Sequence, residues 1–199
     1  MPAHVPAVRA IADLLKESAQ VHRRMSRAHH AAIAQAAEAM TAALTAGRKI
    51  IWFGNGGSAT QSQHMAAEFV GRFCMERRAW PSLSLAENMA SVTAIGNDYH
   101  YHVIFSRQLE GLGQPGDVAV GLSTSGTSAN VLAALKRGKE LGLTTIWLTR
   151  ASATRMQAVC DICIGVPSTV TARIQEAHLT IGHILCALVE EALIKTGGR

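Results

Sequence analysis

The sequence has 199 residues, of which 48% are hydrophobic and 17% charged, which is the size and composition of one domain with a substantial core. Its 19 lysine and arginine residues outnumber 14 acidic ones, but the surplus is dispersed and forms no clustered stripe or reader motif for nucleic acid. The N-terminus lacks the basic and apolar regions of a signal peptide, and no uninterrupted apolar run approaches the roughly 18 residues of a membrane span, so we expect a cytoplasmic protein with neither nucleic acid nor membrane as a partner.

The N-terminal stretch has a helical pattern. Residues 7–47 are rich in Ala, Leu, Met and Arg, and their apolar positions recur at helical spacing until Gly47. Two helices are predicted here. The stretch lacks the turn chemistry and basic recognition face of a helix-turn-helix protein. We therefore expect residues 1–47 to form a helical extension that packs against the domain or another subunit, and residues 48–199 to form the core.

Beyond Gly47, short apolar segments rich in β-formers alternate with amphipathic segments. This alternation predicts a parallel sheet covered by helices on both faces, which is a three-layer αβα sandwich of the α/β class. No linker or repeat divides the chain, so residues 1–199 are expected to form a single domain. The predicted strands are 49–53, 81–85, 117–122, 144–149 and 162–166, and the predicted helices are 59–72, 88–112, 129–141 and 172–195.

Two polar loops follow the first and third predicted strands. Ligands of open parallel sheets bind beyond the carboxyl ends of the strands, where these loops lie. The first loop is Gly54-Asn55-Gly56-Gly57-Ser58, in which the glycines permit close backbone approach and Ser58 can cap the next helix, with Gln61 completing a capping box. Its backbone N–H groups can therefore point at an anion.

The second loop, Ser123-Thr124-Ser125-Gly126-Thr127-Ser128, places five hydroxyls directly before a predicted helix. Hydroxyls and a helix N-terminus together can bind phosphate. Either loop alone could be only a tight turn with an N-cap, but two such loops at one sheet edge favour phosphate. Neither loop has a nucleotide-triphosphate or dinucleotide motif.

Candidate metal ligands lie on two predicted helices. His64 and Glu68 share one helix face, which makes a half-site for zinc. The last predicted helix carries Gln175, Glu176, His178 and His183 among apolar neighbours, although one histidine on such a face is more often a satisfied core residue. In one continuous helix Gln175 and His183 would lie about 12 Å apart along the axis. Either Gln175 lies in a non-helical first turn, or an adjoining subunit helps to complete a shared site.

The motifs resemble the sedoheptulose 7-phosphate (phosphoheptose) isomerases, a branch of the sugar isomerase, or SIS, fold, over nearly the whole chain. The resemblance implies a flavodoxin-like sheet of five parallel strands and a homotetramer with active sites at subunit interfaces. It rests on residues 54–59, on Gln63-His64 through Ala67-Glu68, on residues 94–99, on residues 116–126, and on Arg173-Ile174-Gln175-Glu176 with Gly182-His183.

In this family sedoheptulose 7-phosphate becomes D-glycero-D-manno-heptose 7-phosphate by proton transfer through an enediol, the first step towards nucleotide-activated heptoses. The resemblance implies that Glu68 and His183 are the acid–base pair. It implies one zinc ion per subunit, held by His64, Glu68, Gln175 and His183. The implied substrate-binding residues are Asn55, Gly56, Gly57, Ser58, Glu68, Asn97, Asp98, Ser123, Thr124, Ser125, Ser128 and Gln175.

The sequence departs from the family pattern at Gln61, Glu87, His102 and Val170 and over residues 150–155. These changes leave the metal set intact and leave the preferred sugar open.

Three alternative functions share this fold. A non-catalytic adaptor that resembles these isomerases and binds the bacterial replication initiator lacks the acid–base pair, whereas Glu68 and His183 are both present here. Isomerases of other sugar phosphates, such as arabinose 5-phosphate, do not usually carry the 173–176 stretch with its downstream histidine. A sugar-phosphate sensor of a transcription factor would need a DNA-reading module, and none is attached. The enzyme that acts on a phosphorylated heptose is therefore favoured.

Overall fold

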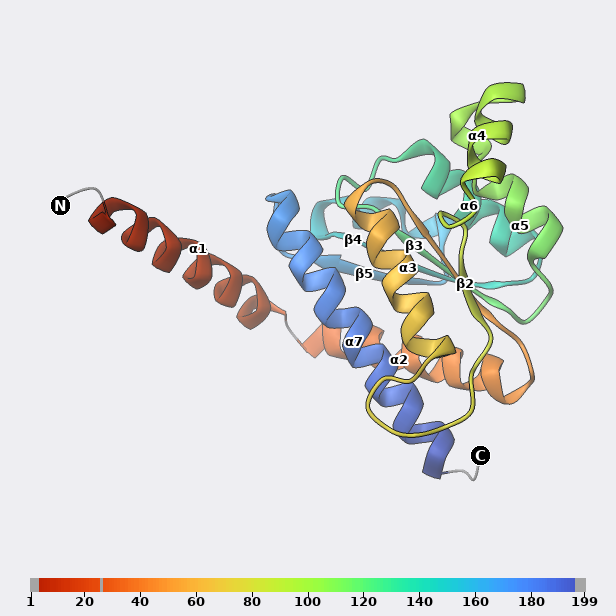
Figure 1. Cartoon of the computed structure of the whole chain (residues 1–199), viewed down its shortest axis with the longest axis horizontal. Helices are drawn as coiled ribbons and strands as arrows, with labels where there is room; N and C mark the ends of the chain where they lie inside the picture. The colour runs from red at the N-terminus through yellow and green to blue at the C-terminus, as the bar shows by residue number, and fades with distance from the viewer. Residues whose placement is uncertain (1–3, 26, 196–199) are drawn as a thin grey trace.

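A computed structural model describes residues 4–25 and 27–195, and its centre is one sheet of five parallel strands in the order β2-β1-β3-β4-β5 (Figure 1). The predicted αβα sandwich is confirmed, and each predicted strand is found within one residue at either end. The strands are β1 (Ile50–Gly54), β2 (Ser82–Ser84), β3 (Val118–Leu122), β4 (Thr144–Arg150) and β5 (Ile162–Val166).

Helices cover both faces of the sheet because strand side chains alternate between the faces. Ile50 and Trp52 belong to one buried cluster, together with apolar residues of the helices on that face, and Ile51 and Phe53 belong to the cluster on the opposite face. The helices on the first face are α2 (Arg27–Thr45), α3 (Gly57–Val70) and α7 (Thr171–Lys195), and those on the second face are α5 (Ser106–Leu112) and α6 (Ala129–Glu140).

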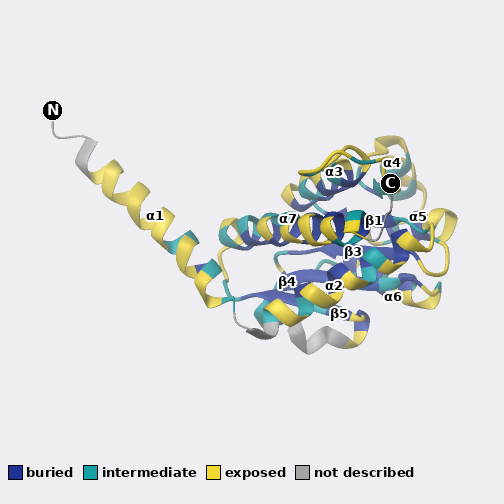
Figure 2. Cartoon of the chain, turned by 90° about the horizontal axis from the view of Figure 1, so that it is seen from below, coloured by how far each residue is buried: buried dark blue, intermediate teal, exposed yellow. Residues whose placement is uncertain are grey.

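The first helix, α1 (His4–Arg24), extends away from the sandwich (Figure 2). Its C-terminal part contacts α7, where Ser18 donates a hydrogen bond to Glu176 at 2.7 Å. Residues 6–16 of this helix are solvent-exposed in the single chain and carry an apolar stripe. The stripe consists of Val8, Ile11, Leu14 and Leu15.

One predicted helix differs from the structure. The predicted helix over 88–112 is wrong, because the chain takes an extended conformation at His100 (φ −152°, ψ 149°) and leaves the helix there. In its place lie α4 (Met89–Asp98), the short 3-10 helix η1 (Tyr101–Val103) and α5. A second 3-10 helix, η2 (Ala151–Val159), occupies the stretch that departs from the family pattern.

The capping role predicted for Ser58 is also wrong. Gly56 takes a positive φ of 54° and is itself the N-cap residue, so α3 begins at Gly57 and Ser58 lies inside the helix. Gln61 closes no capping box, because its side-chain Nε2 donates to the carbonyl oxygen of Gln175 at 2.7 Å. The Gln61 side chain therefore links α3 to α7.

The last helix, α7, is a core helix of this fold. Among the described helices it alone is long and apolar enough to span a membrane by length and composition, but half of its most apolar window is buried inside the protein. Ile174, Ile181 and Leu185 pack into the cluster on the sheet. This packing accounts for its hydropathy.

A buried histidine ties α7 to β4. His178 is 1% exposed, and its Nε2 donates a hydrogen bond to the carbonyl oxygen of Thr149 at 3.3 Å. Among the described residues, its Nδ1 has no hydrogen-bond partner. Burial is the main influence on this imidazole and lowers its pKa to about 4. The folded protein therefore keeps His178 neutral across the physiological pH range.

This histidine makes the stability of the protein depend on pH. The unfolded chain, with an ordinary pKa near 6.5, takes up the proton first, so the stabilisation is complete above pH ~6.5 and is lost as the pH falls towards 4. We expect wild type to lose about 3 kcal/mol more unfolding free energy than His178→Leu between pH 7 and pH 4. Urea unfolding at several pH values measures this difference, and parallel losses in both proteins would contradict it.

Candidate functional site

The two polar loops begin side by side at one edge of the sheet. Strands β1 and β3 are neighbours in parallel register, and Gly54 pairs with Leu122 at their ends. The chain leaves β1 towards β2 on one side and returns through β3 on the other, so this edge is the switch point at which doubly wound sheets bind ligands. The structure therefore brings the two predicted phosphate loops together.

The second loop gathers three serine hydroxyls. The Oγ atom of Ser123 lies 2.9 Å from that of Ser128 and 3.4 Å from that of Ser125, and the Ser125 and Ser128 oxygens are 3.5 Å apart. Thr149 holds the loop on the sheet by donating to the carbonyl oxygen of Ser123 at 3.0 Å. Thr124 is half-buried in the same loop. Hydroxyls converging at the start of α6 can donate to the oxygens of a phosphate group.

An amide pair joins the first loop to the second. The Nδ2 atom of Asn55 donates to Oδ1 of Asn130 at 2.8 Å, and Nδ2 of Asn130 donates back to Oδ1 of Asn55 at 2.8 Å. Tyr101 of η1 donates its hydroxyl hydrogen to the same Asn55 oxygen at 3.0 Å. Asn130 and Tyr101 were not predicted as site residues from the sequence. A signal for Asn130 was present, since it is an amide in the first turn after a hydroxyl-rich loop.

The remaining residues of the first loop lie at the N-terminus of α3. Gly56 and Gly57 are exposed there, whereas Ser58 is 4% exposed and packs beneath the loop against Gly54. The side-chain amide of Gln175 lies directly against Gly57, so a Cβ atom at that glycine would overlap it. Gln175 thus reaches the phosphate loop from α7.

The predicted contacts Asn97 and Asp98 lie at the C-terminal end of α4. Both are exposed, and Nδ2 of Asn97 donates to Oδ1 of Asp98 at 2.8 Å. The same helix borders a cavity of about 170 Å³ on the outer side of the first loop. The cavity is lined by residues of the loop, α4 and η1, among them Asn55, Met89, Val92 and Tyr101.

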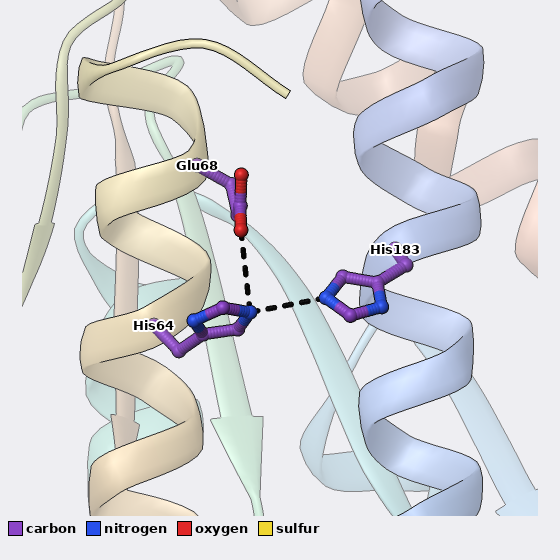
Figure 3. A group of neighbouring side chains, drawn as sticks. All are labelled: His64, Glu68 and His183. Carbon is purple, nitrogen blue, oxygen red and sulfur yellow. Dashed lines mark hydrogen bonds and ion pairs between the residues drawn. The ribbon is translucent and has the colours of Figure 1, made fainter. Parts of the chain in front are cut away.

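Three predicted metal ligands meet between α3 and α7 (Figure 3). The Nε2 atom of His64 lies 3.3 Å from Oε1 of Glu68 and 3.0 Å from Nε2 of His183. All three ligand atoms lie within 4.8 Å of one another, and all three residues belong to one chain. The side chains of Glu68 and His183 are half-buried, and that of His64 is exposed.

This group fits a zinc ion by its donor atoms and its geometry. Two imidazole nitrogens and one carboxylate are the ligands of many catalytic zinc sites, which keep one position open for substrate or water. Gln175 lies in the continuous helix α7 from Thr171 to Lys195, so the alternative of a non-helical first turn is wrong. Its amide lies at Gly57, which precedes His64 by about two turns of α3. Its predicted role as the fourth ligand stays a prediction.

The chain is similar to known proteins in both sequence and structure. A SIS domain is recognised over residues 13–150. The chain is 53% identical over 162 residues to a phosphoheptose isomerase of Rhodospirillum rubrum, covering 81% of this chain and 86% of the relative. It is 42% identical over 192 residues to a phosphoheptose isomerase of Maridesulfovibrio salexigens, covering 96% and 94%.

Solved structures are similar over nearly the whole length. A phosphoheptose isomerase of Neisseria gonorrhoeae superposes with a TM-score of 0.87 at 36% identity, covering 93% of this chain and 99% of that one. A phosphoheptose isomerase of Francisella tularensis gives a TM-score of 0.88 at 35% identity, covering 93% and 98%. Both matches extend beyond the SIS-domain match, so the likeness is not confined to residues 13–150.

Proposed function

Because the chain belongs to the phosphoheptose isomerases, a family of aldose–ketose isomerases with a SIS domain, we propose that it converts sedoheptulose 7-phosphate into D-glycero-D-manno-heptose 7-phosphate with the help of one zinc ion per subunit. The observation that supports the metal-assisted reaction is the meeting of His64, Glu68 and His183 beside two loops suited to phosphate.

The loops orient the substrate. The Ser123, Ser125 and Ser128 hydroxyls and the N-termini of α3 and α6 hold the phosphate, which lies far from the reacting carbons of a seven-carbon sugar. Binding energy from this remote group fixes C1 and C2 for reaction. The Gln175 side-chain amide lies against Gly57 of the phosphate loop, which supports its proposed contact with the sugar chain.

Glu68 and His183 move the protons. In the ketose-to-aldose direction the Glu68 carboxylate removes a proton from C1, and the same proton is returned to C2 of the enediol. His183 transfers a proton between the two oxygens, so that O1 becomes the carbonyl and O2 the hydroxyl. A bound zinc ion would supply Lewis-acid polarisation of the substrate oxygens. The Nε2 atom of His64 faces Oε1 of Glu68 at 3.3 Å, and in the proposed metal site both atoms would be ligands of the zinc ion.

We also propose a cytoplasmic homotetramer whose product feeds the synthesis of nucleotide-activated heptoses. The exposed apolar stripe of α1 supports oligomerisation, because it is an apolar surface that another subunit can bury. The stripe lies on the helix that contacts α7, the helix that carries His183.

Removing His64 tests the metal site directly. His64→Ala is expected to weaken zinc affinity by about 100-fold, since it removes one of three ligands that lie within 4.8 Å of one another. Zinc content after dialysis is measured by mass spectrometry. His102→Ala is the matched control, because His102 lies on η1 outside this group. Undiminished zinc in His64→Ala would remove that residue from the site.

A change at Asn130 tests the phosphate loops. Asn130→Asp removes the amide donor to Asn55 and places a negative charge beside the substrate phosphate, so KM for the sugar phosphate is expected to rise about tenfold or more. Steady-state kinetics measure it. Asn88→Asp makes the same change at the N-cap of α4, where the side chain only accepts a hydrogen bond, and should leave KM unchanged. Equal KM values in both variants would argue against phosphate at these loops.

A further inference from the structure

A buried ion pair anchors the connection between α3 and β2, residues 71–81. Arg77 of this connection contacts Glu190 of α7, with Nε 2.9 Å from Oε1 and side-chain exposures of 2% and 1%. A buried pair of this kind costs stability unless the remaining hydrogen-bonding positions of both partners are filled. Here Glu190 also accepts from backbone N–H groups and Arg77 also donates to backbone carbonyl groups, so both partners make further hydrogen bonds.

The Glu190 carboxylate receives three backbone hydrogen bonds from the connection. They come from the N–H groups of Phe73 at 3.2 Å, Cys74 at 2.8 Å and Met75 at 2.9 Å. Burial alone would raise the pKa of Glu190, but these donors and the Arg77 guanidinium outweigh it and hold the pKa below its usual value. The charged carboxylate therefore fastens the start of the connection to α7.

Arg77 fastens the other side of the connection to the end of α3. Its Nη2 donates to the carbonyl oxygen of Glu68 at 2.8 Å, and its Nη1 donates to that of Phe69 at 2.9 Å. These are carbonyl groups of the last helical turn, which lack partners within the helix. The guanidinium also lies 3.7 Å from the ring centroid of Trp80. The backbone of Glu68 is thus held by a side chain that is itself fixed to α7.

Phe73 contacts His183, which forms the proposed acid–base pair with Glu68. Its ring stacks on the imidazole of His183, with centroids 5.5 Å apart and an interplanar angle of 29°. Glu190, which binds the Phe73 backbone, lies about two turns beyond His183 on α7. One short connection therefore contacts the backbone of Glu68 and the ring of His183.

We propose that the α3–β2 connection positions Glu68 and His183. In it, the Arg77–Glu190 pair and the Phe73 ring set the orientation of His183 relative to Glu68. Arg77, Glu190 and Phe73 are positioning residues in this proposal, which means that they act through Glu68 and His183 and not by contact with substrate or metal. The inference rests on the proposed function, because the geometry matters only if Glu68 and His183 act together. Catalytic and metal-binding groups must be held within about 0.5 Å of their productive positions, which makes such support consequential.

Phe73→Leu tests the element, because it keeps an apolar side chain and removes the stacked ring. We expect zinc affinity, measured by competition with a chromophoric chelator, and kcat each to fall about tenfold, with KM for sedoheptulose 7-phosphate unchanged. Phe73→Tyr keeps the ring and should restore both values. Arg77→Lys, which keeps the charge but loses the fork that reaches the Glu68 carbonyl, should lower kcat in the same way without changing KM.

The outcomes separate this inference from the proposed function. Wild-type protein that neither binds zinc nor converts the sugar would contradict the proposed function. Wild-type protein that does both, with Phe73→Leu equal to it in zinc affinity and kcat, would overturn the inference alone. Equal losses in Phe73→Leu and Phe73→Tyr would also overturn it, since the ring would then not be the cause. Thermal unfolding of each variant is measured as well, so that a loss of the fold is distinguished from a loss of the contact.

Discussion

Replacing Glu68 by glutamine is expected to lower kcat by about 100- to 10,000-fold, the range that general acid–base groups contribute. The amide has nearly the same shape as the carboxylate and can still contact His64, whose Nε2 lies 3.3 Å from Oε1 of Glu68. It cannot take a proton from carbon. The side chain is 21% exposed, so the exchange should leave the fold intact. Conversion followed by NMR measures the effect.

The control for this variant is Glu140→Gln. Glu140 is the last residue of α6, its side chain is 62% exposed, and it pairs with Arg137 at 2.8 Å. The Glu140→Gln protein should convert substrate at the wild-type rate. If Glu68→Gln also kept the wild-type rate, with wild-type zinc content, Glu68 would not be the base.

Gly182→Ala is expected to push apart α3 and α7, the helices that carry His64, Glu68 and His183. A Cβ atom at Gly182 would overlap the sulfur of Met65, which is 1% exposed. Gly182 and Met65 are the chain neighbours of His183 and His64, so the close approach at this point is what lets the two imidazoles meet. Overpacking of a core costs about 1 to 3 kcal/mol, whereas the gain in helix propensity from glycine to alanine is at most about 1 kcal/mol.

The net result should be a loss of about 1 to 2 kcal/mol in unfolding free energy, with weaker zinc binding. Urea unfolding and chelator competition measure the two effects. Gly111→Ala in α5 is the matched control, because a Cβ atom there meets open space and should be neutral or stabilising. Met65→Ala should relieve the clash, so that Gly182→Ala costs less in that background. If Gly182→Ala lowered the unfolding free energy equally in wild type and in Met65→Ala, contact with Met65 would not be the cause of the loss.

Features with a sequence period could be predicted. The five strands and the pairing of His64 with Glu68 follow from alternation and from helical spacing, which depend only on neighbouring residues. The adjacency of the two loops followed from the rule that parallel strands end at one edge. His183 was a candidate from its place on the last predicted helix, but only the resemblance to a family joined it to His64 and Glu68, because spacing along the chain cannot connect two distant helices.

Features formed by contacts between distant segments could not be predicted from the sequence. The Asn55–Asn130 amide pair and the stacking of Phe73 on His183 depend on how close helices and loops approach one another. Apolar residues in the connection over 71–81 do not recur at helical or strand spacing. The sequence therefore contained no sign that Glu190 binds its backbone. Ser58 was misplaced because Gly56 itself starts α3.

The most direct measurement is the conversion of sedoheptulose 7-phosphate by the zinc-loaded protein, followed by NMR. Appearance of the aldose D-glycero-D-manno-heptose 7-phosphate, with no conversion of unphosphorylated sedoheptulose at the same concentration, is the predicted result. Failure of the fully folded, zinc-loaded protein to form any aldose from the phosphorylated ketose would contradict it.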